Sequence, residues 1–117
     1  MNQALNRNRF KKILTENRLD GFIVTNPINI FYLTGFKGIS RNEREAILVL
    51  KRILLVQGES LIRSETTLIV PRLYQNEAKK LASKDLKIKI VSERNQLFEE
   101  ATKLLENCKI VGFETNN

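Results

Sequence analysis

Hydrophobic positions recur with two different periods along the chain, and these periods predict helices and strands in alternation. Apolar residues three and four positions apart are typical of a helix with one buried face. Short apolar, β-branched runs between them are typical of strands. By these criteria, helices are predicted at residues 2–17, 27–34 and 72–83, and in a last segment capped by Asn95. Strands are predicted at residues 21–25, 66–70, 87–91 and 109–114.

Residues 26–36 (NPINIFYLTGF) combine several signals for a short helix. Asn26 is suited to cap its N-terminus, and Pro27 fits a first helical turn, where an N–H would have no helical partner. Gly35 is suited to end the helix. Three apolar residues share one face of it: Ile28, Phe31 and Tyr32. The chain then enters a polar loop, residues 36–44, and loops beyond strand ends are common ligand sites in open α/β sheets.

The apolar run at residues 45–57 (EAILVLKRILLVQ) allows two interpretations. Two strands joined at Lys51-Arg52 are one, although neither residue favours the positive φ of a tight hairpin turn. One long strand that bends there is the other, and a continuous apolar run suits a strand covered on both faces. Residues 58–65 are predicted to form a loop or a hairpin excursion. The whole pattern predicts one three-layer α/β domain over residues 1–117, with a mixed β-sheet flanked by helices.

Composition and charge narrow the class of protein. The 117 residues, 42% apolar and 28% charged, suffice for one core without disulfides. No run has the length of a membrane-spanning helix, and the N-terminus lacks the apolar core of a signal peptide. The net charge of +7 suits a polyanion partner, but the basic residues are scattered and not interleaved with aromatic residues, which argues against nucleic acid. The lone cysteine, Cys108, excludes an internal disulfide and fits a cytoplasmic location.

The sequence contains no histidine, so the commonest general base and a common metal ligand are missing. Cys108 has no histidine to activate it and is interpreted as a packing residue. Five scattered carboxylates show no pattern typical of a metal site: Asp20, Glu43, Glu45, Glu65 and Glu114. We therefore predict no catalytic and no metal-binding residue in these 117 residues.

Three motifs, taken in order, resemble the N-terminal domain of the creatinase/prolidase/aminopeptidase P family. The first is N-x-x-Y-L-T-G-F at residues 29–36, the second is R-x-Y after a strand, and the third is the closing I-x-G-F-E at residues 110–114. The positions interpreted as structural members of the first two motifs are Asn29, Tyr32, Gly35, Arg72 and Tyr74. Residues 70–74 (VPRLY) depart from the Asp-Gly-Arg-Tyr-like run of many members, and the segment at residues 51–65 is longer than usual.

The resemblance implies that the catalytic unit lies outside these residues. In this family a separate C-terminal "pita-bread" domain binds two divalent metal ions through Asp, His and Glu side chains and cleaves bonds that precede proline. The chain then corresponds to the non-catalytic N-terminal domain of a Xaa-Pro dipeptidase or aminopeptidase. Its expected partners are its own C-terminal catalytic domain, a second subunit in a homodimer and, in the intact protein, proline-containing peptides. No cofactor is expected in the fragment itself.

The polar loop supplies the candidate substrate contacts. Arg41 or Arg44 would pair with a substrate carboxylate, because guanidinium groups match carboxylates in geometry. Phe36 would form an apolar wall near the proline ring. The alternative is a core aromatic residue and two ordinary surface charges. Tyr32 is interpreted as a core residue with a hydrogen-bonded hydroxyl, and Asn29 as a residue that bonds to nearby backbone.

A function of a different class stays open from the sequence. The same fold also serves as a stand-alone protein- or peptide-binding module without peptidase activity, as in the peptidase-like domains of histone chaperones. The net charge of +7 argues against a surface that holds basic tails.

Overall fold

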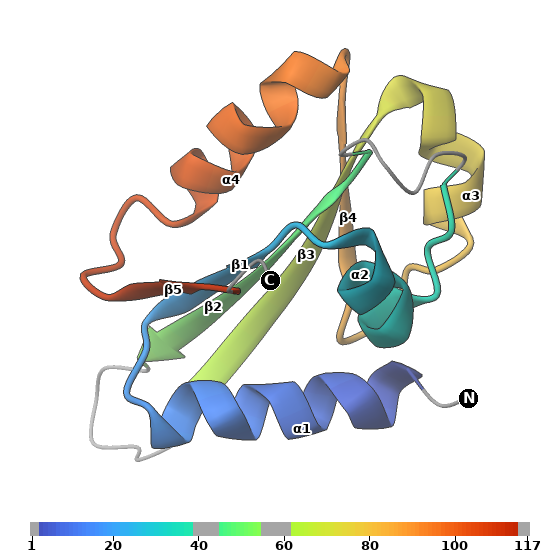
Figure 1. Cartoon of the computed structure of the whole chain (residues 1–117). Coiled ribbons are helices and arrows are strands. Elements are labelled where there is room, and N and C mark those ends of the chain that lie inside the picture. The colour runs from blue at the N-terminus through green and yellow to red at the C-terminus, as the bar shows by residue number, and fades with distance from the viewer. Residues whose placement is uncertain (1–2, 39–44, 55–61, 115–117) are drawn as a thin grey trace.

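The computed structural model describes residues 3–38, 45–54 and 62–114, which form a five-stranded mixed sheet between helices (Figure 1). The strands are β1 (Gly21–Val24), β2 (Ile47–Leu54), β3 (Ile62–Pro71), β4 (Lys87–Val91) and β5 (Val111–Phe113). Their order across the sheet is β4-β3-β2-β1-β5. β2 is antiparallel to both of its neighbours, whereas β4 lies parallel to β3 at one edge and β5 parallel to β1 at the other. The predicted α/β fold with a mixed sheet is confirmed.

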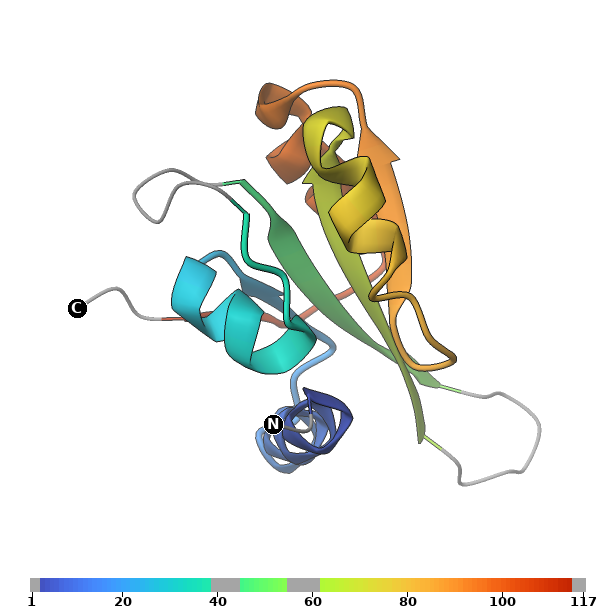
Figure 2. The same ribbon diagram turned by 90° about the vertical axis from the view of Figure 1, so that its right-hand side faces the viewer.

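Helices cover both faces of the sheet. On one face lie α1 (Gln3–Glu16), α2 (Pro27–Thr34), the short 3₁₀ turn η1 (Arg72–Tyr74) and α3 (Gln75–Lys79). On the other face lies α4 (Leu97–Leu104), preceded by the 3₁₀ turn η2 (Arg94–Gln96). Figure 2 shows α1 nearly end-on below α2, with α3 beside β4. None of the helices in the described residues is both long and apolar enough to cross a membrane.

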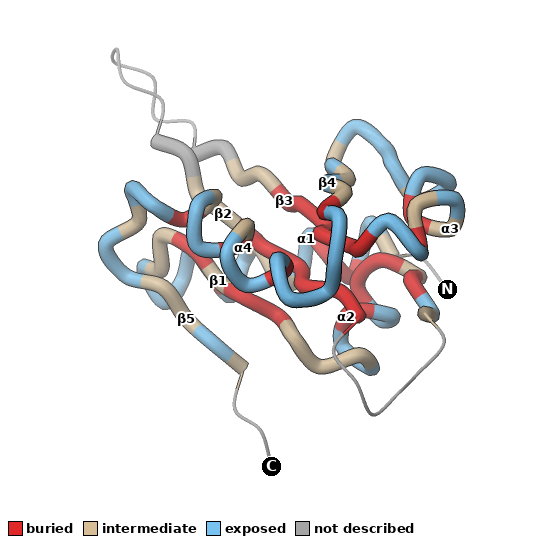
Figure 3. Tube along the Cα trace, turned by 90° about the horizontal axis from the view of Figure 1, so that it is seen from above, coloured by how far each residue is buried: buried red, intermediate tan, exposed pale blue. Residues whose placement is uncertain are grey.

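The middle strands are buried on both faces, which explains why their sequence is almost continuously apolar (Figure 3). In β2, Leu48 and Leu50 face α1 and α2, while Ile47 and Val49 face α4. β2 continues through Lys51 and pairs with β1 and β3 there. Of the two interpretations of this segment, the single strand is therefore correct.

The segments on either side of Pro71 differ from the prediction. β3 begins at Ile62, so the second half of the predicted loop at residues 58–65 is strand, while residues 58–61 lie outside the described residues. The predicted helix at residues 72–83 is replaced by η1 and the short α3. Leu73 is 73% exposed and not part of the core face. The helix ends early because the chain must turn into the parallel strand β4, through a tight turn in which Ser83 and Leu86 exchange backbone hydrogen bonds.

The start of the last helix was also predicted wrongly. Asn95 lies inside η2, and the cap residue is Glu93, whose side chain and that of Gln96 form a reciprocal capping box. The helix α4 buries Leu97 and Ala101, but Phe98 is 45% exposed. The sequence contained the Glu-x-x-Gln spacing of this cap, but asparagine is the more frequent cap residue.

Candidate functional site

The helix α2, which carries the first motif, has both ends defined by the residues that its sequence predicted. The Asn26 side chain accepts a hydrogen bond from the Ile28 N–H at 2.8 Å, and Pro27 occupies the first turn. At the other end, Gly35 has a φ of 84°, a left-handed conformation that favours glycine. Its N–H donates to the Phe31 carbonyl at 2.8 Å. The helix therefore begins and ends where expected.

The buried face of α2 is not the predicted one. Ile30, Leu33 and Thr34 are buried against α1 and the sheet. The three residues that share the opposite face are exposed: Ile28 by 73%, Phe31 by 37% and Tyr32 by 44%. The interpretation of Tyr32 as a core residue is therefore wrong. We call these three side chains the α2 apolar surface. The helix α2 itself contains no charged residue.

A carboxylate from the third motif closes the N-terminal end of α2. Because β5 lies parallel to β1 with Phe113 opposite Ile23, Glu114 arrives beside the junction between β1 and α2. Its side chain accepts hydrogen bonds from the backbone N–H groups of Thr25 and Asn26, and from the Thr25 hydroxyl at 2.9 Å. The Asn29 amide donates to its second oxygen at 2.7 Å. Asn29 thus bonds to Glu114 and not to nearby backbone, so that interpretation is wrong.

These hydrogen bonds also set the charge state of Glu114. Burial raises the pKa of the carboxyl group, but the hydrogen bonds from Asn29, Asn26 and Thr25 together outweigh it, so its pKa lies below the ordinary value. The ionised carboxylate also lies at the N-terminus of α2, where the helix dipole favours negative charge. Through the Asn29–Glu114 hydrogen bond, the first and third motifs are in contact and form one structural unit.

The C-terminal end of α2 is held by two polar side chains of α1, Arg7 and Asn6. Arg7 is only 4% exposed. Its guanidinium donates to the Leu33 carbonyl at 2.8 Å and makes two hydrogen bonds to Asp85, at 3.0 and 2.8 Å. The Asn6 amide donates to the Tyr32 carbonyl at 2.9 Å. Both side chains donate to carbonyls in the last turn of the helix, which have no helical partner. No periodicity signal identifies a buried arginine, and this role was missed.

The Arg7–Asp85 pair predicts a loss of stability in acid. The Arg7 hydrogen bond holds the pKa of Asp85 at about 2, below its ordinary value of 3.8. Because the folded-state pKa is the lower one, the stabilisation is complete above about pH 4 and is lost as the pH falls to about 2. We expect the free energy of unfolding to decrease by about 2 kcal/mol from this group over that interval. Urea titrations from pH 5 to 2 would test this, and Asp85→Asn should remove most of the slope.

Beyond α2, the chain passes a buried cluster that we call the Tyr74 cluster: Phe36, Glu45 and Tyr74. The Phe36 and Tyr74 rings meet edge to face, with centroids 5.6 Å apart and an interplanar angle of 88°. The Tyr74 hydroxyl donates to the Glu45 carboxylate at 2.5 Å, and the Arg94 guanidinium lies 3.4 Å from the same oxygen. The cluster therefore joins the start of the polar loop, its end, and η1.

Of the three candidate substrate contacts, the structure describes only Phe36. Phe36 is 4% exposed and packs in the core, which is the alternative considered for it. Arg41 and Arg44 lie outside the described residues. Tyr74 is buried and Arg72 is exposed.

The carboxylates examined as a metal cluster have other partners. Asp20 accepts hydrogen bonds from the Ile110 and Lys109 N–H groups at 3.0 Å each, and these bonds lower its pKa. Among the described residues, no group of three or more Asp, Glu, Cys or His side chains is placed to hold a metal ion. Glu43 lies outside this part of the chain. Burial raises the pKa of the Cys108 thiol, as for a packing residue.

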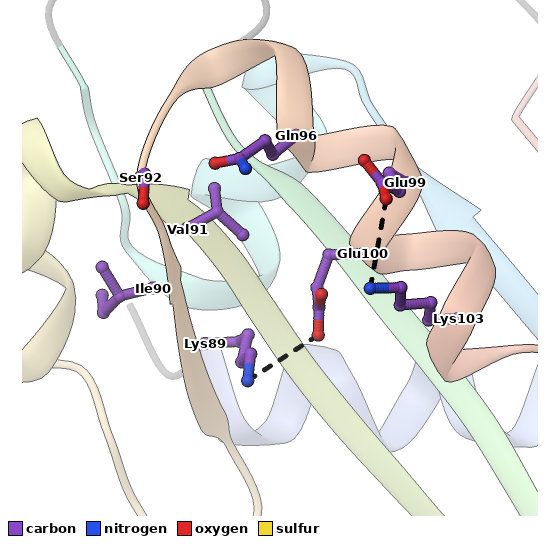
Figure 4. A pocket seen from close by; sticks show the side chains of 8 residues that line it. All are labelled: Lys89, Ile90, Val91, Ser92, Gln96, Glu99, Glu100 and Lys103. Carbon is purple, nitrogen blue, oxygen red and sulfur yellow. Dashed lines mark ion pairs between the residues drawn. The ribbon is translucent and has the colours of Figure 1, made fainter.

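A shallow groove lies on the opposite side of the sheet, between β4 and α4 (Figure 4). Two pairs of opposite charge cross or border it: Lys89 with Glu100 at 3.8 Å, and Lys103 with Glu99 at 4.0 Å. Such exposed pairs are typical of a solvated surface. The carboxylates of the groove are engaged in these pairs, and we assign no chemistry to it.

Comparison with known proteins agrees with this architecture. The chain matches the family described as Creatinase/Prolidase N-terminal domain over residues 7–117. No curated protein sequence matches it. Among solved structures, a Xaa-Pro dipeptidase from Bacillus anthracis superimposes with a TM-score of 0.69 at 18% identity, over 97% of this chain and 27% of that one.

Two further structures have similar folds. The aminopeptidase P from Streptococcus thermophilus gives a TM-score of 0.65 at 19% identity, over 95% of this chain and 73% of that one. The N-terminal domain of the cytoplasmic peptidase PepQ from Mycobacterium tuberculosis gives 0.61 at 21% identity, over 92% and 71%. At these identities the structures show a common fold. Because the family match covers nearly all of the sequence, and its motifs meet around α2, this chain belongs to the creatinase/prolidase N-terminal domain family.

Proposed function

We propose that the chain is the non-catalytic N-terminal domain of a Xaa-Pro metallopeptidase. The observation that carries this proposal is the family match over residues 7–117, in a chain that spans only 27% of the Bacillus anthracis dipeptidase. In such an enzyme, a separate catalytic domain would hold two divalent metal ions, and these would supply activation of water. The described residues of this chain do not fit such a metal site, and the sequence has no histidine, so we assign it no step of the hydrolysis.

The α2 apolar surface supports a role in contacts with the catalytic domain. It exposes three large apolar side chains on a helix whose two ends are held by Glu114 and Arg7. A rigid apolar surface loses little conformational entropy on association. Glu114 bonds to Asn26 and Asn29 of this helix, so the C-terminal end of the described chain lies beside it. We propose the catalytic domain as the partner of this surface, in a protein that forms a homodimer.

The polar loop is proposed to shape the substrate pocket of the intact protein. Arg41 or Arg44 would bind the carboxylate of a proline-containing peptide, whereas Phe36 packs in the core beneath the start of the loop. Support comes from the Tyr74 cluster, which anchors the described residues on both sides of this loop. The preference between dipeptides and longer peptides is left open by relatives of both kinds.

In the intact peptidase, Arg41→Ala and Arg44→Ala are expected to raise KM for a Xaa-Pro dipeptide about tenfold, because a charged hydrogen bond to substrate is lost. Steady-state kinetics would measure this, with Arg9→Ala on the exposed side of α1 as the control. Unchanged KM in both loop variants would remove the proposed substrate contact.

A binding module without peptidase activity is the second candidate, and the exposed α2 apolar surface favours it as well. The reading frame beyond Asn117 separates the two candidates. A downstream segment with the Asp, His and Glu metal ligands supports the peptidase, and its absence supports the binding module. We also propose a cytoplasmic location, supported by the lone Cys108 and by the description of the mycobacterial relative.

A further inference from the structure

The excess positive charge of the chain lies mainly in two segments on the same face of the sheet. Residues 3–18, which contain α1, carry five basic side chains and one acidic one. Residues 72–86, which contain η1 and α3, carry four basic and two acidic side chains. Residues 92–109, which contain α4 on the other face, carry three basic and four acidic side chains. The two faces therefore differ in net charge, which the order of residues along the chain does not reveal.

A groove lies between the two basic segments, and we call it the α1 groove. It is lined by the first two turns of α1, by the end of α2 and by the turn between α3 and β4. Its volume is about 690 Å³, within the size range of ligand sites. Arg7 and Asp85 both line it. The Asp85 carboxylate accepts two hydrogen bonds from Arg7 and one from the Ser83 hydroxyl, at 2.6 Å, so its charge is already compensated.

Three lysines surround the α1 groove. Lys80 lines it, Lys84 directly precedes Asp85, and Lys11 is one turn beyond Arg7 on α1. The pKa of Asp85 is lowered mainly by Arg7 and in part by the charge of Lys11, so Lys11 lies close to the same carboxyl group. Within residues 3–38, 45–54 and 62–114, none of the three lysines forms an ion pair. Positive charge that is not compensated around a hollow attracts an anion.

The lining of the α1 groove favours an acidic peptide over other polyanions. None of the described residues that line it is aromatic, so a nucleic-acid base has no side chain on which to stack. A hollow also does not suit a lipid surface, which apolar side chains enter by protruding. Ala4 and Leu81 give the lining an apolar part. This combination suits a segment that carries carboxylates on either side of an aliphatic residue.

We propose that the α1 groove binds an acidic peptide segment of a partner protein. Carboxylates of the segment pair with Lys11, Lys80 and Lys84, and an aliphatic side chain packs against Leu81. Each exposed ion pair contributes little by itself, so binding requires several pairs together and weakens as salt is added. The site contains no residue of the α2 apolar surface. It goes beyond both proposed functions and depends on neither of them.

The proposal is tested by titrating the 117-residue chain with the peptide acetyl-EELEELEE-amide at low salt, followed in two-dimensional ¹H–¹⁵N spectra. The matched control peptide is acetyl-QQLQQLQQ-amide, which has the same length without the charge. We expect the backbone amide resonances of Ala4, Leu81 and Ser83 to shift with the acidic peptide only, and to return when salt is raised to about 0.5 M. Unshifted resonances at these residues would overturn the proposal.

A triple variant locates the binding energy. Changing Lys11, Lys80 and Lys84 to Gln is expected to raise the Kd for the acidic peptide about tenfold or more, because each pair contributes a factor of about two to five. An unchanged Kd in this variant would contradict the proposed pairs. The peptide comparison uses the unaltered chain, so it decides the proposal even if the variant is unstable.

The matched control removes the same charge elsewhere, with Lys89, Lys103 and Lys109 changed to Gln. Its Kd should stay within about twofold of the wild-type value, since two of these lysines already pair with Glu100 and Glu99. An equal loss in both triple variants would mean attraction by net charge alone and would overturn the site. Tighter binding of oligothymidylate or phosphatidylserine vesicles than of the acidic peptide would show that the proposed class of partner is wrong.

Discussion

Arg7→Ala is expected to lower the free energy of unfolding by about 3 kcal/mol, because it leaves a buried carbonyl and a half-buried carboxylate without this donor. The guanidinium is bonded to the Leu33 carbonyl and to both oxygens of Asp85, and its side chain is only 5% exposed. Removing the guanidinium leaves the Leu33 carbonyl at the end of α2 and the Asp85 carboxylate without these hydrogen bonds. Equilibrium urea unfolding measures the change.

Arg9→Ala is the matched control for this prediction. Arg9 lies on the exposed side of the same helix, so its removal is expected to change stability by less than about 0.5 kcal/mol. Combining Arg7→Ala with Asp85→Ala should cost less than the sum of the two single changes, because either one already breaks the pair. An Arg7→Ala loss no greater than that of Arg9→Ala would show that the pair contributes nothing to the fold.

Glu114→Ala is expected to cost about 2 kcal/mol, since one carboxylate accepts four hydrogen bonds around the start of α2. The N–H groups of Thr25 and Asn26 would lose their acceptor, and Asn29 would lose its partner. Hydrogen exchange should therefore accelerate at residues 25–30 more than in β2 and β3. Mass spectrometry of peptides from these segments, together with urea unfolding, provides the measurement.

Two comparisons sharpen this second prediction. Glu114→Gln keeps the shape of the side chain but presents an NH₂ group to the Asn29 amide. Its loss of stability should therefore be more than half of that caused by Glu114→Ala. Glu106→Ala, at an exposed glutamate after α4, should leave stability and exchange unchanged. Uniform acceleration across the sheet in Glu114→Ala would mean that the carboxylate stabilises the whole fold and has no local role at α2.

Local signals in the sequence were reliable where a short-range interaction decides the structure. Asn26 and Gly35 cap the two ends of α2 as predicted, because capping depends on residues within one turn. The prediction failed for the last helix, where Asn95 was preferred although Glu93 and Gln96 form the cap. It also failed for the length of the helix after Pro71, where the need to enter β4 overrides a favourable apolar pattern.

The sequence by itself determined the alternation of helices and strands, the buried character of β2, and the family, through three motifs that together span most of the chain. Only the tertiary structure decided which face of α2 is buried, since periodicity defines a face but not the neighbour that covers it. It also decided the partners of Arg7, Tyr74 and Glu114. Those pairs join residues 26 to 89 positions apart, and such contacts depend on how the strands and helices are arranged in space, which the pattern within one element does not determine.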